Sequence, residues 1–389
     1  MKILNYFRPL IFFVLILLLV SVSCGSNPNQ STQIPLTGEQ NQVVAATVDS
    51  QESLPEATDL PEPTSTLVPT LVPTIAPTAI PVGFSRAEPH KITDMVTNST
   101  WNVQVLEMQR GEEAWTVLQS TSSNNQPAPE GFEFLSIKLK VEITSTKNSS
   151  IRLSSCSFAV TGDDLMSTSC GQQYIYQPVP VLEGEVFSGG TIEGWVTYII
   201  PKELAKLILI VKDPDSQSAS ANQYVALDDG ASIIVPADLA SIVPNDVGKD
   251  RNNPALITDT IITIAWQFSI LEVIRGQAAY DRILADYPFS GPPDTGMEYI
   301  LVKSNIKRIN NTNWAASIYN GMFGTSGSKG ILYEVPITFN AAKPTVDVDL
   351  FSGGEIEGWF TVQMAIGEEN AVLVFNRSDK TDMRFISLE

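Results

Sequence analysis

Apolar and polar residues alternate along several segments between residue 100 and the C-terminus. In Trp101-Asn-Val-Gln-Val105, every second residue is apolar. Neighbouring side chains of a β-strand point to opposite faces, so this alternation predicts strands with one face in a core. The alternation recurs at 135–143, 191–199, 266–270, 300–306 and 355–364. Two short apolar runs, 207–211 and 371–375, predict fully buried strands.

One short helix interrupts each series of strands. The predicted helices cover 112–119 and 277–285, and a pair of prolines follows each of them. In the first helix, Ala114, Trp115 and Leu118 share one face. Roughly six to eight strands in about 140 residues, with one inserted helix, predict an antiparallel β-sandwich of the all-β class.

The whole series occurs twice. Trp101–Glu107 corresponds to Trp266–Glu272 and Gly131–Phe134 to Gly296–Tyr299, while Phe187–Gly190 and Ile192–Trp195 correspond to Phe351–Gly354 and Ile356–Trp359. The offset is 165 residues for the first two pairs and 164 for the last two, which is typical of a duplicated domain with one net deletion. We therefore expect two copies of one sandwich in tandem.

The domain boundaries follow from this repeat. A chain of 389 residues can hold two or three domains, and we expect domains at 91–236 and 253–389, joined by a linker at 237–252. Ahead of them, 24–90 is predicted to be a disordered tether. From residue 25 to about residue 83 it contains no lysine, arginine or aromatic residue and is rich in proline and threonine.

Residues 1–23 are predicted to be an export signal. Lys2 and Arg8 precede an apolar run at 10–22, which is too short to cross a bilayer. The run ends in Ser21-Val-Ser-Cys24, which resembles the signal of bacterial lipoproteins, although leucine is usual where Ser21 stands. The resemblance implies cleavage before Cys24 and acylation of that cysteine. The alternative is a plain secretory peptide cut near Ser23, which leaves Cys24 as a free thiol.

Three cysteines are an odd number for an exported protein. Lipidation of Cys24 leaves Cys156 and Cys170, which lie symmetrically about Asp163 in a Gly-Asp-Asp turn. Facing positions of a hairpin share such a midpoint, so we expect a cross-strand disulfide between these two. A pair of buried free thiols is the alternative.

Charge and histidine content exclude several functions. The chain has 24 basic and 43 acidic residues, a net charge of −19, which disfavours binding to nucleic acid or to anionic lipid headgroups. The one histidine, His90, is expected to be a solvated tether residue, and a single histidine excludes multi-histidine metal sites. No phosphate loop, dinucleotide fingerprint or zinc spacing is present, so we expect no cofactor and no metal.

The repeated motifs resemble a known family. An Arg-Gly turn at Arg110, the motif Gly-(Phe/Met)-Glu-(Phe/Tyr) at Gly131, and Gly-Gly-x-Ile-Glu-Gly-Trp195 occur in both copies. They are similar to the telokin-like immunoglobulin-fold domains of bacterial surface lipoproteins, a family of unknown function. The resemblance covers roughly 91–236 and 253–389. It implies two immunoglobulin-like β-sandwiches outside the cytoplasm and supplies no catalytic residues.

Two tryptophans and two glutamates are the candidate ligand contacts. Trp101 shares the parity of the apolar face and is expected in a core, like its counterpart in the second copy. Trp195 and Trp359 lie on the other face of their strands beside Glu193 and Glu357, respectively. An outward tryptophan next to a carboxylate can stack on a sugar or on a partner protein. The alternative is that each tryptophan covers its own hairpin or the inserted helix.

Other polar clusters have weaker claims. The acidic turns at 213–215 and 228–229 lack the spacing of a dedicated calcium loop. Arg110 is expected to pair with Glu107 or with Glu133, and its counterpart in the second copy likewise.

We therefore expect an extracytoplasmic protein, held to the membrane by its N-terminal lipid, with a non-catalytic binding or scaffolding role at the cell envelope. The partner would be an envelope protein or a glycan, and not nucleic acid; the sequence leaves the oligomeric state open. A structural spacer without a specific ligand is the alternative, and a carboxylate-based hydrolase is a weaker one.

Overall fold

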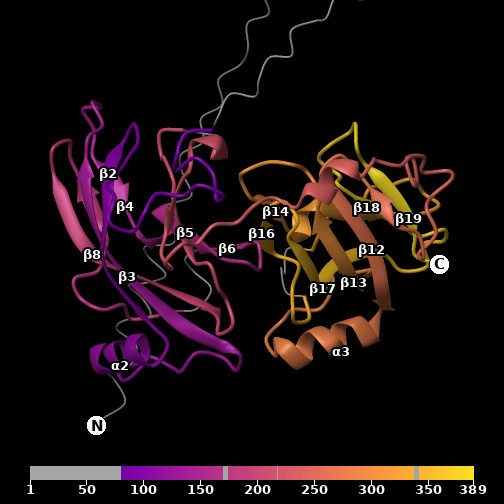
Figure 1. Cartoon of the computed structure of the whole chain (residues 1–389). Coiled ribbons are helices and arrows are strands. Elements are labelled where there is room, and N and C mark those ends of the chain that lie inside the picture. Colours follow the sequence, from indigo (N-terminus) through magenta and orange to yellow (C-terminus); the bar gives the residue numbers. More distant parts are fainter. Residues whose placement is uncertain (1–79, 170–173, 217, 337–340) are drawn as a thin grey trace, which may run out of the picture. The chain divides into compact units, whose positions relative to one another are not determined.

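The computed structural model describes residues 80–169, 174–216, 218–336 and 341–389 (Figure 1). All of them belong to one compact unit, Ile75–Glu389. The predicted signal peptide, Cys24, most of the tether and Cys170 lie outside the described residues. We call residues 80–242 the first half and residues 243–389 the second half.

The first half contains two main sheets and one small one. The first sheet has the antiparallel order β1 (Val96–Thr97), β2 (Trp101–Arg110), β3 (Phe132–Ile143), β8 (Thr191–Pro201). The second contains β10 (Gln223–Ala226), β9 (Ile208–Val211), β5 (Phe158–Thr161) and β6 (Met166–Ser169). The small sheet pairs β4 (Ile151–Leu153) with β7 (Gly184–Val186), and helix α2 spans Glu112–Thr121.

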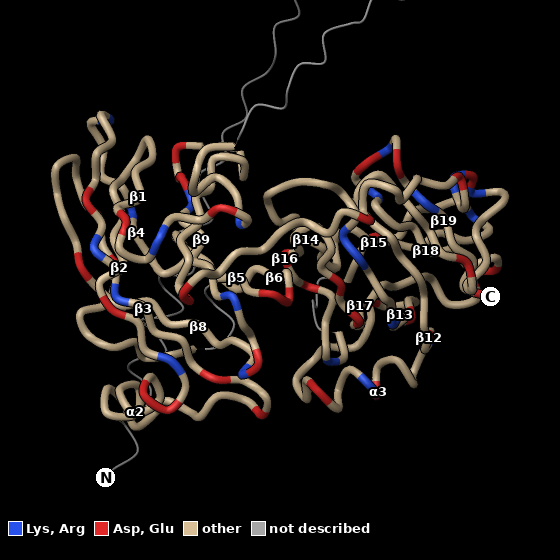
Figure 2. Tube along the Cα trace, in the orientation of Figure 1, with Lys and Arg blue, Asp and Glu red and all other residues tan. Residues whose placement is uncertain are grey.

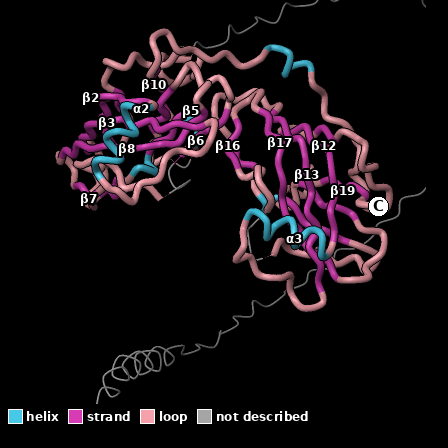
Figure 3. The backbone as a smooth tube through the Cα atoms, turned by 90° about the horizontal axis from the view of Figure 1, so that it is seen from below, coloured by secondary structure: helices cyan, strands magenta, loops and turns pink. Residues whose placement is uncertain are grey.

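The second half is also built of antiparallel strands with one helix, α3 (Figure 3). Its first sheet is β11 (Ile261–Ile262), β12 (Trp266–Arg275), β13 (Met297–Arg308), β17 (Glu355–Ala365). Facing it are β15 (Phe323–Ser326), β18 (Val372–Phe375) and β19 (Arg384–Ser387), and β14 (Ala316–Ile318) pairs with β16 (Val348–Leu350). Helix α3 spans Gln277–Asp286. Short 3₁₀ turns are η1 (Ser155–Ser157), η2 (Ala219–Ala221), η3 (Ala237–Ser241) and η4 (Asn320–Met322).

The alternating residues of the sequence form the core between the two sheets of each half. Trp101 is 1% exposed and stacks on Phe158, with ring centroids 5.9 Å apart. In the second half, Phe268 stacks on Phe375, with ring centroids 4.8 Å apart. These rings come from facing sheets, so burying them holds the two layers together. The predicted all-β sandwich fold is confirmed, and so is the core position of Trp101.

Each helix is attached by the Arg-Gly turn. Gly111 and Gly276 precede the helices with φ of 62° and 64°, a conformation that a side chain would strain. Beside the first turn, Arg110 Nε lies 2.5 Å from Glu133 Oε1, which confirms one of the two expected pairings. In Figure 1, α3 lies at one end of β12 and β13, and its buried residue Ile283 packs against that sheet.

One sheet is continuous between the halves. Strand β6 of the first half pairs with β16 of the second, and Asp349 lies opposite Ser167. Lysines and arginines lie among aspartates and glutamates along both halves (Figure 2).

Residues 83–90, which the sequence assigned to the tether, are packed against β10 of the first half instead. Tyr224 N–H donates to the Gly83 carbonyl at 2.8 Å, and His90 N–H donates to the Tyr224 carbonyl at 2.8 Å. His90 Nε2 is 2.9 Å from Gln223 Oε1, so His90 is a structural residue and not a solvated tether residue.

Candidate functional site

A cavity lies in the second half, beside β16 and β17, with two serines of β6 at its margin. Its volume is about 700 Å³, within the range of small-ligand pockets. Its walls carry aromatic rings, carboxylates, an amide and hydroxyl groups. The groups that bear on ligand binding belong to Tyr287, Tyr319, Asn320, Asp347, Asp349 and Trp359.

A crossing segment shapes one wall. Trp359 N–H donates to the Pro344 carbonyl at 2.8 Å, and Val346 N–H donates to the Trp359 carbonyl at 3.2 Å. The segment passes so close to Gly358 that a β-carbon there would lie 2.9 Å from the Thr345 carbonyl carbon. In the first half, a β-carbon added at Gly194 would likewise lie 2.4 Å from Leu182 N. The glycine of each Glu-Gly-Trp motif is therefore required by this close approach.

A turn presents an aromatic ring and an amide to the cavity. Tyr319 comes directly before η4, and its ring lies over Gly321, where a β-carbon would be 2.6 Å from ring atom Cε2. The Tyr319 side chain is 45% exposed, so its ring is open to stacking. Asn320 Oδ1 accepts a hydrogen bond from Thr361 N–H at 2.9 Å. Its Nδ2 is buried and has no partner within the described part of the chain, which leaves a donor for a bound molecule.

Two carboxylates occupy alternate positions at β16. Asp347 and Asp349 therefore project to the same side of the strand. Partial burial, and after it the charge of Asp349, raise the pKa of Asp347 above its usual value. Ser317 Oγ donates a hydrogen bond to Asp349 Oδ1, which orients that carboxylate. The lining is thus acidic and favours a neutral or amine-bearing ligand over an anion.

The structure separates the four residues predicted to contact a ligand. Trp195 and Trp359 are 7% and 6% exposed, so the expectation that they point outward to solvent is wrong. Trp359 packs in a cluster with Ile283 of α3, as the alternative interpretation expected, and one edge of it lines the cavity. Ligand contact at Trp195 stays a prediction.

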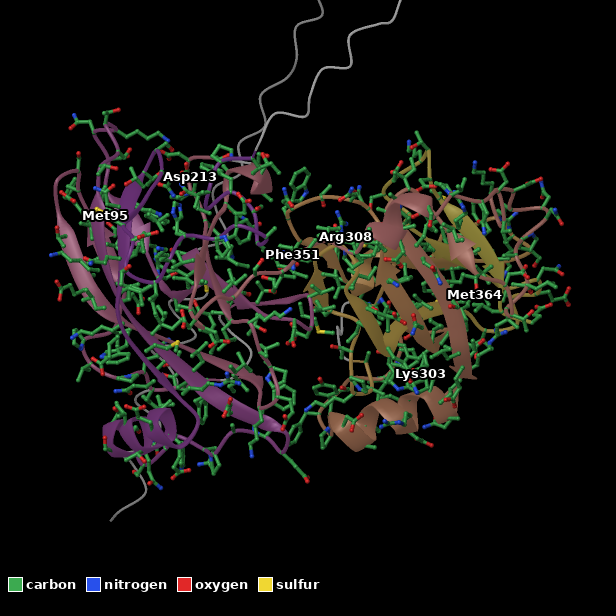
Figure 4. The ribbon with its side chains drawn as sticks, viewed as in Figure 1. Met95, Asp213, Lys303, Arg308, Phe351 and Met364 are labelled. Carbon is green, nitrogen blue, oxygen red and sulfur yellow. The ribbon has the colours of Figure 1, made fainter. Side chains whose placement is uncertain are left out.

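Both predicted glutamates are ion-paired at the surface. Glu193 lies 3.7 Å from Lys140, and Glu357 lies 2.5 Å from Lys303 across the strands. Lys303 is labelled in Figure 4. Neither glutamate lines the cavity, and their role as ligand contacts also stays a prediction.

Sequence reasoning missed Tyr319, Asn320, Asp347 and Asp349. They lie in or beside the 3₁₀ turn η4 and the three-residue strand β16, which are too short to show a periodicity. A usable signal was the difference between the two copies: the position of Tyr319 holds Ser154 in the first copy.

Other candidate groups have structural partners. Although burial alone raises its pKa, hydrogen bonds from Ser99 and Thr100 bring the pKa of Asp213 below its usual value. The Asp228 carboxylate accepts from Leu207 N–H at 2.8 Å. No cluster of three or more potential metal ligands occurs among the residues that the structure describes.

The cysteine hairpin is present, with its centre one residue later than expected. Ala159 pairs with Ser169 and Thr161 with Ser167 across β5 and β6. Cys156 is disulfide-bonded. Its predicted partner, Cys170, lies outside the described residues, so that pairing stays a prediction.

Comparison with known proteins places part of the chain. Residues 90–222 match a family described as a domain of unknown function, DUF4352. No curated protein sequence matches. Within residues 80–389, apart from the gaps at 170–173, 217 and 337–340, no helix is long and apolar enough to cross a membrane.

Several solved structures are similar to the chain, including two from Bacillus subtilis and one from Clostridium difficile. The ycdA protein of Bacillus subtilis, a proposed lipoprotein, is 12% identical with a TM-score of 0.26; the match covers 34% of this chain and 38% of that one. The yjhA protein of Bacillus subtilis is 16% identical with a TM-score of 0.23, over 36% and 99% of the two chains. A β-sandwich protein of Clostridium difficile is 11% identical with a TM-score of 0.25, over 39% and 100%. This chain therefore spans well under half of the ycdA protein.

Proposed function

We propose that this protein is a lipid-anchored, non-catalytic binding protein of the bacterial cell envelope, and that its ligand is a neutral or amine-bearing glycan held in the cavity beside β16. Its folded part consists of two immunoglobulin-like copies of one domain, and the prolines and threonines before them form a tether. Cys24 carries the lipid. Support for the anchor comes from the short apolar run and from the small residues that precede this cysteine.

The unpartnered Nδ2 of Asn320 carries the ligand proposal. A buried amide donor without an acceptor costs free energy unless a water molecule or a ligand supplies one. It lies in the same cavity as the exposed Tyr319 ring and the carboxylates of Asp347 and Asp349. Aromatic rings stack on the apolar faces of sugars, and carboxylates and amides bond to hydroxyl groups, so this combination suits a glycan.

Binding of the full chain to fragments of bacterial envelope polysaccharide tests the proposal. We expect binding to wild type, and at least about a tenfold loss in Tyr319→Ala and in Asp347→Asn. Tyr174→Ala is the matched control, because Tyr174 is 80% exposed and does not line the cavity. Equal binding by Tyr319→Ala and wild type would refute the cavity as the binding site. Absence of any binding would favour the structural-spacer hypothesis.

A carboxylate-based hydrolase is the second candidate, because Asp347 and Asp349 share the cavity and the pKa of Asp347 is raised. Glycosidases place their two carboxylates on opposite sides of the scissile bond. Here Asp347 directly precedes β16 and Asp349 lies in it, so both carboxylates project to one side of the same segment, which favours binding. Release of reducing ends from a bound polysaccharide by wild type, and its loss in Asp347→Asn, would establish the hydrolase instead.

The anchor is tested separately. Cells expressing the full chain should incorporate labelled palmitate into it, and the Cys24→Ser variant should carry no label. A labelled Cys24→Ser variant would refute acylation at this residue.

A further inference from the structure

The second half inserts a phenylalanine into the first half. Phe351, directly after β16, is 1% exposed and packs with Ile210 and Tyr224. The Arg86 guanidinium lies 3.8 Å from the centre of its ring (Phe351 is labelled in Figure 4). Phe351 N–H donates to the Leu165 carbonyl at 2.8 Å. Together with the pairing of β16 to β6, these contacts join the halves.

The motif that does this, Phe-Ser-Gly-Gly, is present in the first half without an equivalent contact. Phe187 directly follows β7 and is 67% exposed. In the described residues β7 pairs with β4 alone, and no backbone hydrogen bond from Phe187 N–H is recorded. Gly353 has Pro236 and Leu165 within 3.2 Å of an added β-carbon, whereas Gly189 has no atom within 4 Å. We call β7 with Phe187 the head surface.

The second half carries the counterpart of the receiving strand. The bridge between Thr325 and Tyr333 repeats the pairing of Val160 with Thr168, so residues 331–333 correspond to β6. No strand is paired with the other edge of 331–333 in the described chain, whereas the other edge of β6 pairs with β16. We call residues 330–333 the tail surface.

Details of the tail surface match those of β6. Ile331 and Leu332 are 50% and 46% exposed, although both are large and apolar. Gly330, at the turn before them, has φ of 70°, and Leu165, which accepts the Phe351 N–H bond, has φ of 61° at the corresponding turn. An unpaired strand edge with exposed apolar side chains can form backbone hydrogen bonds with a strand of another chain.

We propose that two copies of this chain associate head to tail: β7 of one copy pairs antiparallel with residues 331–333 of the next, as β16 pairs with β6 within each copy. In the corresponding register, Val186 lies opposite Ile331, and Phe187 N–H donates to the Gly330 carbonyl. The pairing of β16 with β6 within the chain is the model for this contact, so the partner that binds each surface is a second copy of the same chain.

The site that would receive the Phe187 ring on the tail surface differs from the site that holds the Phe351 ring. A β-carbon on Gly324 would lie 3.2 Å from Leu332 Cδ1, so the Leu332 side chain covers the position that Ala159 holds in the first half. Arg251, which corresponds to Arg86, bonds to Ser326 Oγ at 3.3 Å. Phe187 therefore packs on Leu332 near the surface, and the contact between copies is weaker than the internal junction.

This contact is heterologous, because two different surfaces meet. Such a contact leaves a free head and a free tail on every dimer, so it propagates into strings of copies. The net charge of −19 makes the copies repel each other, and salt screens that repulsion. Association should therefore strengthen as ionic strength rises.

Sedimentation velocity of the full chain in excess detergent, from about 1 to 100 micromolar, tests the proposal. We expect concentration-dependent dimers and longer species in wild type. Phe187→Asp and Ile331→Asp should each weaken association at least about tenfold, because each buries a charge in the contact. Phe289→Asp is the matched control, since Phe289 is a fully exposed phenylalanine outside both surfaces.

Mixing the two variants gives the decisive result. Phe187→Asp retains a working tail and Ile331→Asp a working head, so an equimolar mixture should form dimers that grow no further. A wild type that stays monomeric over this range overturns the proposal. So does association that neither variant weakens, or a mixture that forms no dimers.

Discussion

Replacement of Phe351 by alanine should separate the two halves. The ring is 1% exposed and contributes to a cluster that contains Ile208 and Ile210. Removal of a buried phenylalanine side chain costs about 3–5 kcal/mol. We expect the upper part of this range, because the guanidinium of Arg86, 1% exposed, would lose the aromatic face 3.8 Å away.

The assay is urea denaturation of the full chain, followed by tryptophan fluorescence. Wild type should unfold in one transition, because one sheet runs through both halves. Phe351→Ala should lower the free energy of unfolding of the first half and split the curve into two transitions. Phe187→Ala is the matched control from the same motif; with its ring 67% exposed, it should change stability by less than about 0.5 kcal/mol.

Two results would refute this reasoning. A decrease of less than about 1 kcal/mol in the free energy of unfolding of Phe351→Ala would mean that the Phe351 ring is not tightly packed. Equal losses in Phe351→Ala and Phe187→Ala would mean that the two copies of the motif have the same environment.

Three further predictions concern single residues. Gly194→Ala should destabilise the protein by about 1–3 kcal/mol in thermal melts, because its β-carbon would lie 2.4 Å from backbone, whereas Gly184→Ala, with 3.4 Å of space, should change the melting temperature little. The pKa of Asp347 in the folded protein is raised above its usual value of 3.8, so the free energy of unfolding should fall as pH rises from 3.8 to the folded-state pKa. In urea titrations at a series of pH values, Asp347→Asn should lack this pH-dependent loss of stability. Thiol labelling of the denatured, unreduced chain should leave Cys156 unmodified, and Cys156→Ser should cost about 3 kcal/mol if Cys170 closes a loop of about 15 residues.

The positions of β2 and β12 were predictable because one face of each strand is buried and the other is more exposed. In β2 and β12 the alternation of apolar and polar residues records this arrangement directly. Helix bounds were also close, since α2 begins at residue 112 as expected and continues two residues beyond the expected end. The Arg-Gly turn allowed the pairing of Arg110 with Glu133 to be expected, as one of two options.

The burial of Trp195 and Trp359 was not predictable from the alternation of apolar and polar residues along their strands. Alternation assigns a residue to a face of its strand, but it does not say what covers that face. In β17 the face opposite the core is covered by α3, so Trp359 is buried although its parity is that of the polar Glu357. The cavity was missed for a related reason: its walls come from η4, β16 and β17, and no local pattern records that they meet.

The two Phe-Ser-Gly-Gly segments have different surroundings, since Phe351 is 1% exposed and Phe187 is 67% exposed. Among the described residues, the junction of β16 with β6 is matched by no pairing at β7 beyond β4 or at the outer edge of 331–333. Terminal repeats that act as caps carry polar groups on such faces. Here the tail is partly closed by Leu332, yet Leu332 and Ile331 stay about half exposed, and the head keeps an exposed Phe187. An exposed apolar residue on the head surface and two on the tail surface are what a contact between further copies requires.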